Sequence, residues 1–219
     1  LMVDNPQPTL GELWRLEQAL SLVEDEYDLV VIDTPPSLNA LTRTAWVASD
    51  RVVVVSEPSF FSVVAADRAN KAINEISTKL SPRLALHGIV VNRLRENSEE
   101  HNFRLSELRE MFGEKIIYPH FAERTTLQQS TGAATPIHSW PSEAGADISR
   151  AFDSILSGVL ADMKSATQVR RTRSTSPIER AIRGTAKETL GEFTESIQIV
   201  EEKSGFSFKR KPKGRRAKN

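Results

Sequence analysis

The 219-residue chain contains no cysteine, which excludes disulfides, thiolate zinc sites and iron–sulfur clusters and suits a reducing cytosol. No apolar run approaches the roughly 18 residues needed to span a bilayer, and the amino end shows no signal peptide. We therefore expect a cytoplasmic protein. With 39% apolar and 26% charged residues, the chain can bury one good core.

Glycine is informative for a different reason, because none of the ten glycines is followed by lysine. A phosphate-binding loop of the GxxxxGK[ST] type needs small residues for close backbone approach and a lysine that reaches the β- and γ-phosphates. The 219 residues therefore lack this loop. Because the first residue is Leu1 rather than methionine, we expect a fragment whose upstream part carries it.

Charge is divided unevenly along a chain whose net charge is zero. Residues 1–163 hold 14 Lys+Arg and 23 Asp+Glu, a net of −9, whereas residues 164–219 hold 15 and 6, a net of +9. An acidic globule joined to a basic tail indicates that the tail seeks polyanions. Seven of the ten residues from 209 to 218 are basic, namely Lys209, Arg210, Lys211, Lys213, Arg215, Arg216 and Lys218.

Three interpretations of this basic segment stay open. Its cations would release counterions from DNA, which gives salt-sensitive binding without sequence preference. The same cations would attract an anionic membrane surface, particularly if an amphipathic helix before them lies on lipid. The segment would otherwise serve only as a solubilising end.

Short apolar runs without polar alternation predict strands buried on both faces of a parallel sheet. They span residues 29–32, 52–55 and 86–91, with a shorter candidate at 116–118. Helical periodicity separates them, and Thr9 with Glu12 predicts a capping box ahead of a first helix. The later helices are expected at residues 66–80, 103–112 and 148–163. This alternation predicts an α/β fold, a doubly wound, mainly parallel sheet with helices on both faces.

The change of composition after Met163 predicts the domain organisation. Residues 1–163 form the α/β domain, and the polar, basic residues 164–175 form a linker. An N-cap serine and a first-turn proline open an amphipathic helix at 176–203. Residues 204–219 form a basic disordered tail.

The segment YDLVVIDTPP, from Tyr27 to Pro36, ends an apolar strand on one aspartate and two prolines. Nucleotide-binding α/β proteins place the carboxylate that orders a magnesium ion at the carboxyl end of such a strand. Magnesium keeps several waters and takes few protein carboxylates, so Asp33 alone suffices beside nucleotide phosphates.

Over roughly residues 13–163, the chain resembles the ParA family of partition ATPases, within the MinD and ParA group of deviant-Walker P-loop proteins. The similar segments are RLEQALSLVEDEYDLVVIDTPPSLNALTRTAWVASDRVVVV, GIVVNRL, the IYP step at Ile117–Pro119 and the run from Arg124 to Gly132. The resemblance implies a P-loop NTPase-like fold that is incomplete at its amino end, and ATP and Mg²⁺ as ligands.

The resemblance assigns roles residue by residue. Asp33 matches the Walker B aspartate, which makes it the catalytic and metal-binding candidate, holding Mg²⁺ through water, and Thr34 is assigned with it to the nucleotide. Asn92 matches the position that contacts adenine, and Pro119 lies in the loop that flanks the base. Arg124 matches an arginine that contributes to DNA binding.

The resemblance also implies an ATP-dependent homodimer that binds DNA nonspecifically on the nucleoid and is discharged by a ParB-like partner. The chain alone is expected to be inactive without the phosphate-binding loop. A family segment with two arginines before a glycine reads Pro141-Ser-Glu-Ala-Gly145 here, so a second DNA-contacting arginine is absent. Two alternatives stay open: a non-catalytic DNA- or partner-binding module, and a MinD-type membrane-associated ATPase.

Overall fold

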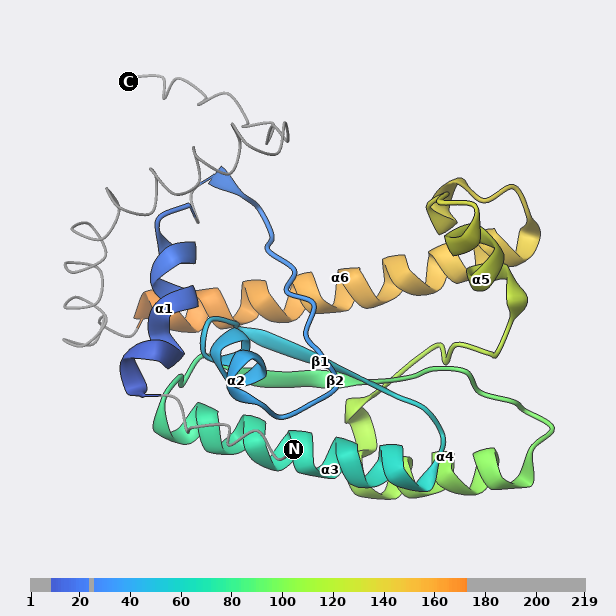
Figure 1. The fold of residues 1–219 in the computed structure, drawn as a ribbon, viewed down its shortest axis with the longest axis horizontal. Helices are drawn as coiled ribbons and strands as arrows, with labels where there is room; N and C mark the ends of the chain where they lie inside the picture. The colour runs from blue at the N-terminus through green and yellow to red at the C-terminus, as the bar shows by residue number, and fades with distance from the viewer. Residues whose placement is uncertain (1–8, 24–25, 173–219) are drawn as a thin grey trace, which may run out of the picture. The chain divides into compact units, whose positions relative to one another are not determined.

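The computed structural model describes residues 9–23 and 26–172 of the chain (Figure 1). These residues fall into two compact units, one that precedes Ser49 and one that begins there. The amphipathic helix predicted at 176–203 and the basic tail at 204–219 lie outside the described residues, and the predicted domain limits stay a prediction.

The first unit contains α1 (Leu10–Ser21) and α2 (Ala40–Val47), which pack against each other. The predicted capping box is confirmed, since the Thr9 hydroxyl accepts from the Glu12 amide at 3.3 Å and the Glu12 carboxylate accepts from the Thr9 amide at 2.8 Å. Each bond satisfies an amide that the helix itself leaves without a partner. The sequence thus defines the start of α1 correctly.

The strand predicted at residues 29–32 is wrong. Residues 27–39 form an irregular connection between α1 and α2, and Val31 is 83% exposed. The apolar run predicts a strand with neighbours on both sides, but no described strand forms a ladder with it. Without inter-strand hydrogen bonds, nothing holds the backbone of this segment in regular extended geometry.

The second unit is built on a parallel sheet in the order β1-β2-β3. Its strands are β1 (Arg51–Ser56), β2 (Ala85–Val91) and β3 (Ile116–Ile117). All three confirm predicted strands. Residues Arg51 and Ser56 of β1 pair with Ala85 and Val91 of β2, so nearly the whole of each strand takes part. β3 is short and pairs only with Ile89 and Val90.

Helices cover both faces of this sheet, as predicted. Helices α3 (Phe60–Lys79) and α4 (Glu99–Phe112) lie on one side, and α6 (Glu143–Thr172) crosses the other (Figure 1). The short elements are η2 (Gly113–Lys115), α5 (Thr125–Gly132) and η3 (Ile137–Ser139). The fold is therefore an α/β arrangement of the expected class.

Several helix boundaries differ from the prediction. α3 begins at Phe60 rather than at residue 66, and α6 begins at Glu143 rather than at residue 148. α4 begins at Glu99 rather than at residue 103, because the Ser98 hydroxyl caps it by accepting from the His101 amide at 3.3 Å. α6 continues through Thr172, so residues 164–172, assigned to a linker, are helical instead. The sequence from 159 to 172 contains no glycine or proline that would end the helix.

The core lies on both faces of the sheet. On the α3 side, Ile73 and Ile76 are at most 2% exposed. On the α6 side, Ile148 and Ala151 pack with Val90 of the central strand and with Phe121. A buried isoleucine side chain contributes about 1.5–3 kcal/mol, so Ile148 helps to hold α6 on the sheet.

One partly buried ion pair ties α6 to the amino ends of the strands. The Arg51 guanidinium donates to both carboxylate oxygens of Asp162, at 2.8 and 3.0 Å, and His87 Nδ1 lies 3.0 Å from the same carboxylate. The hydrogen bond from Arg51 lowers the pKa of Asp162 to about 2, with a smaller contribution from His87. Three elements that are distant in sequence meet at this carboxylate.

We expect Asp162→Asn to remove an acid-sensitive part of the stability. The folded pKa of about 2 lies below the ordinary value of 3.8, so the ionised carboxylate stabilises the fold above pH 4 and loses that effect as the pH falls toward 2. Because Asp162 is partly exposed, solvent screening limits the contribution to about 1 kcal/mol. Chemical denaturation at pH 7, 4 and 3 checks this. An equal loss of stability in both proteins between pH 4 and 3 contradicts it.

Candidate functional site

Asp33, the central candidate, lies in the irregular connection that leads into α2. Its side chain is exposed, and that of Thr34 is half-buried. The Ser37 amide donates to the Pro35 carbonyl at 2.8 Å, which makes a tight turn directly after Asp33. The carboxylate is therefore accessible to a hydrated cation, as binding of Mg²⁺ through water requires.

A buried threonine holds this turn onto α2. The Thr42 hydroxyl donates to the Ser37 carbonyl at 2.6 Å, and Thr42 is only 2% exposed. The Asn39 side chain caps the same helix by accepting from the Thr42 amide at 3.0 Å. The sequence explains this anchor, since Asn is a preferred N-cap residue, but it gives no sign that Thr42 points back to Ser37.

Asn92 follows β2 at the carboxyl end of the parallel sheet. Its amide donates to the carbonyl of Ser56, the last residue of β1, at 2.9 Å. Its side-chain oxygen accepts from the Arg93 amide at 3.0 Å, and Arg93 has a positive φ of 56°. The side-chain oxygen of Asn92 therefore stabilises the turn. The side-chain nitrogen of Asn92 is the group that a ligand can contact.

The segment after β3 runs beside the residues after β2. The Phe121 amide donates to the Val91 carbonyl at 2.9 Å, and the Leu94 amide donates to the Phe121 carbonyl at 2.9 Å. Pro119, which follows Tyr118 through a cis peptide bond, lies two residues before this contact and is exposed. The structure thus brings Asn92 and Pro119 to the same edge of the sheet.

The same edge carries an ion-pair cluster that the sequence analysis missed. Arg93 contacts Glu57 and Glu123, each at 3.1 Å, and Arg95 also contacts Glu123. The hydrogen bond from Arg95 is the main cause that lowers the pKa of Glu123. The only sequence signal is that charged residues follow several apolar segments. The cluster cross-links the loops after β1, β2 and β3.

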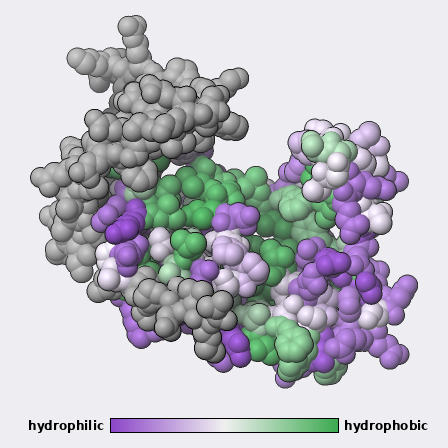
Figure 2. Space-filling view, viewed as in Figure 1, coloured by the Kyte–Doolittle hydropathy of each residue, from purple (hydrophilic) through white to green (hydrophobic). Residues whose placement is uncertain are grey.

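Arg124 directly precedes α5 and is exposed on the surface. Its guanidinium lies 3.8 Å from the Asp147 carboxylate, which Arg150 also contacts. Hydrophilic residues predominate around α5 on the face shown in Figure 2. Arg124 is accessible to a polyanion, although Asp147 partly neutralises it. The seven basic residues of the tail lie outside the described part of the chain.

The predicted site residues are distributed over both units. Asp33 and Thr34 belong to the first unit, and Asn92, Pro119 and Arg124 belong to the second. The common edge of Asn92 and Pro119 is therefore described within one unit, whereas its assembly with Asp33 stays a prediction. Among residues 9–23 and 26–172, no group of three or more His, Asp or Glu side chains is arranged to hold a metal ion.

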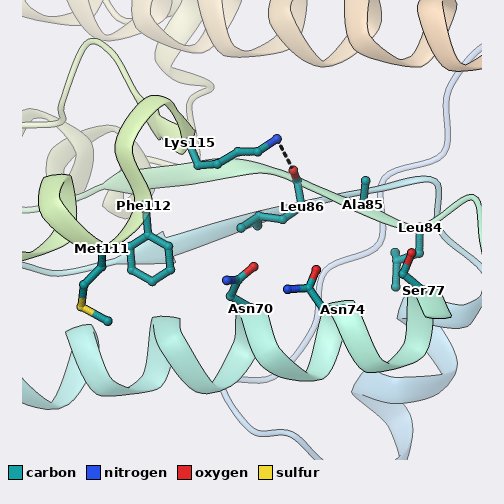
Figure 3. Close-up of a pocket in the computed structure, with 9 residues that line it drawn as sticks. All are labelled: Asn70, Asn74, Ser77, Leu84, Ala85, Leu86, Met111, Phe112 and Lys115. Carbon is teal, nitrogen blue, oxygen red and sulfur yellow. Dashed lines mark hydrogen bonds between the residues drawn. The ribbon is translucent and has the colours of Figure 1, made fainter. Parts of the chain in front are cut away.

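A groove of about 410 Å³ lies at the other end of the sheet, where β2 begins (Figure 3). Residues of α3, the start of β2 and the end of α4 line it. It is separate from the edge that carries Asn92.

Within the described helices, none is long and apolar enough to cross a bilayer.

Comparison with known proteins finds one matching family model and several similar curated proteins. Residues 6–86 match the family model described as an AAA domain. The chain is 25% identical over 142 residues to the sporulation initiation inhibitor protein Soj of Bacillus subtilis, covering 64% of this chain and 56% of Soj. It is 31% identical over 131 residues to the chromosome partitioning protein ParA of Caulobacter vibrioides, covering 59% and 49%.

A solved structure supports the fold. The structure of apo McdA from Cyanothece superposes with a TM-score of 0.60 at 16% identity, covering 71% of this chain and 64% of McdA. At this identity the similarity establishes the fold alone. The chain spans about half the length of the curated relatives that it matches.

Replacing Thr42 by valine tests how the turn after Asp33 is held. Thr42→Val leaves the Ser37 carbonyl without its buried donor, so we expect a loss of about 1–3 kcal/mol in the free energy of unfolding. Amide hydrogen exchange in residues 33–39 should also become faster. Thr44→Val is the control, because the Thr44 hydroxyl bonds only to Ala40 within α2. Equal effects of both substitutions would show that Thr42 does not hold the turn.

Proposed function

Because the chain belongs to the ParA family of P-loop proteins, we propose that it forms part of an ATPase that partitions a chromosome or plasmid, or positions another cargo. The observation that supports this most directly is the accessible Asp33 carboxylate on its anchored turn, in the segment that matches the family's Walker B motif. The chemistry would be ATP hydrolysis at the interface of a homodimer on the nucleoid, stimulated by a ParB-like partner.

In this proposal Asp33 holds Mg²⁺ through water, and Thr34 lies beside the phosphates. The residue types fit, since an exposed single carboxylate supplies the outer ligand that a hydrated Mg²⁺ accepts. Bound magnesium would neutralise charge on the phosphates during transfer. The lysine that reaches the phosphates would come from polypeptide outside these 219 residues, which contain no Gly-Lys pair.

The base of ATP would lie at the edge formed by Asn92 and Pro119. The Asn92 amide nitrogen can donate to a ring nitrogen of adenine, and the exposed Pro119 offers an apolar surface beside it. The loops that hold both residues are tied together by the Phe121 main-chain bonds and by the pairs of Arg93 and Glu123. These contacts join the two loops in the absence of a ligand.

The role of Asp33 is tested in a protein that contains both this chain and a phosphate-binding loop. We expect Asp33→Ala to lower the rate of Mg²⁺-dependent ATP hydrolysis at least tenfold, because the metal loses its protein anchor. Binding of ATP without Mg²⁺ should change little in calorimetry. Asp67→Ala is the control, since Asp67 pairs only with Lys71 on the surface of α3.

Two results would contradict this assignment. Undiminished hydrolysis by Asp33→Ala would remove Asp33 from the metal site. Tight binding of Mg·ATP by the isolated 219-residue chain, measured by the same calorimetry, would show that no further phosphate-binding loop is needed.

Nonspecific DNA binding is the second part of the proposal, carried by Arg124 and the seven basic residues from Lys209 to Lys218. Removing residues 209–219 should sharply reduce retention of DNA at low salt, because up to seven counterion-releasing contacts are lost. The salt dependence of binding should become less steep in parallel. Retention on anionic liposomes but not on DNA would favour the membrane-associated alternative. Unchanged DNA retention after the truncation would exclude the tail.

The missing Gly-Lys pair also favours a second candidate function, a non-catalytic relative that binds DNA or a partner protein. The upstream coding sequence separates the two candidates. A Gly-rich segment ending in Gly-Lys-Thr or Gly-Lys-Ser supports the ATPase, and its absence supports the non-catalytic module.

A further inference from the structure

The groove at the amino end of β2 is unrelated to the proposed nucleotide edge. It lies between α3 and β2 and is closed at one side by the end of α4 (Figure 3). Its volume of about 410 Å³ falls within the range of ordinary ligand sites. Its lining combines side-chain amides, a hydroxyl, one ammonium group and apolar side chains.

A ridge of polar side chains from α3 forms one wall. Asn70, Asn74 and Ser77 follow one another at i, i+4 and i+7, and all three line the groove. Asn70 occupies a place between the buried Ala66 and Ile73, where helical periodicity calls for an apolar residue. Neither asparagine side chain hydrogen-bonds to another described residue, and both amides point toward β2 (Figure 3).

The facing wall comes from Leu84, Ala85 and Leu86, at the start of β2. β3 pairs only with Ile89 and Val90 of β2, so β2 has no strand partner on that side before residue 89 among the described residues. The Leu86 carbonyl instead accepts from the Lys115 ammonium group at 2.9 Å (Figure 3). A flexible side chain thus takes the place of the main-chain donor that a longer β3 would supply.

The ends of the groove add apolar surface and charge. Met111 is 49% exposed and Phe112 is half-buried, so a ligand that covers them buries apolar area. Lys115 is the one charged side chain among the nine lining residues. A ligand with an apolar group and an acidic group fits this composition.

We propose that this groove binds an extended, acidic peptide segment of a partner protein. Side chains at i and i+4 of a helix stand about 6 Å apart along its axis, and main-chain groups on one edge of an extended peptide recur every two residues, at about 6.6–6.8 Å. Asn70 and Asn74 can therefore each pair with one peptide group of the ligand. Each amide offers a donor and an acceptor, which matches a peptide N–H and C=O.

Other occupants fit this wall less well. A helical ligand satisfies its own backbone and needs a continuous apolar groove, which the two asparagines interrupt. A small polyanion would use Lys115 and the amide N–H donors but leaves the amide carbonyls and the apolar end without a partner. An extended chain uses the amides, the apolar end and the ammonium group together.

The test uses the whole 219-residue chain and a fluorescein-labelled eight-residue probe of alternating valine and threonine that ends in two aspartates. Binding is measured by fluorescence anisotropy. A second probe carries N-methyl groups on alternate residues, which removes main-chain donors and keeps the side chains. A third probe ends in two lysines. We expect the first probe to bind and both of the others to bind at least tenfold more weakly.

Variants link the binding to the groove. Asn70→Leu and Asn74→Leu should each weaken the first probe about tenfold, the effect of losing a well-made hydrogen bond, and Lys115→Met should abolish the preference for aspartate. Gln128→Leu, which changes an exposed side-chain amide on α5, is the matched control. Thermal unfolding of each variant confirms that it is folded.

The proposal is overturned if the first probe does not bind, if the N-methylated probe binds equally well, or if both asparagine variants keep full affinity while folded. None of these measurements uses ATP or DNA, so a failure here is distinguishable from a failure of the proposed partition function.

Discussion

The parallel pairing of β1 with β2 is the constraint on which the second unit depends. Because the strands run in the same direction and pair from Arg51 with Ala85 to Ser56 with Val91, with one register shift between Val52 and Val53, the residues that follow them emerge side by side. The bond from Asn92 to Ser56 and the pair of Arg93 with Glu57 are consequences of that register. A slip by one residue would separate these loops and turn the buried side chains to the opposite faces.

The same pairing gives the two ends of the sheet different chemistry. At the carboxyl end, main-chain bonds and exposed ion pairs join the loops and leave the side-chain amide of Asn92 and the ring of Pro119 accessible. At the amino end, Arg51 and His87 hold α6 through Asp162, while β3 starts only opposite Ile89 and leaves the first residues of β2 without a strand partner on that side among the described residues. The groove lies beside this unpaired start of β2.

The sequence predicted what depends on local patterns. The apolar runs of β1 and β2 and the capping box of α1 are strong signals, because each is satisfied by neighbouring residues or by burial on both faces. The sequence did not predict the ion-pair cluster, since Glu57, Arg93 and Glu123 meet only through the topology of the sheet. It also did not predict the polar ridge of α3, because this ridge interrupts the apolar periodicity that indicates the helix. Asp33 was identified from its motif, but the Thr42 anchor that orients its turn was not visible in the sequence.

The incorrect strand prediction at residues 29–32 shows how local sequence pattern and sheet pairing are connected. The segment has the composition of a central strand, yet its valines are exposed where no described strand pairs with it. Central strands gain their regular geometry from ladders on both sides, and this one would need a neighbour to become ordered. The turn after Asp33 is nevertheless held from its other end, by Thr42 and Asn39 of α2. If residues 29–32 paired with a further strand, their backbone would become a regular strand that ends at Asp33. The turn that follows Asp33 is already held by α2.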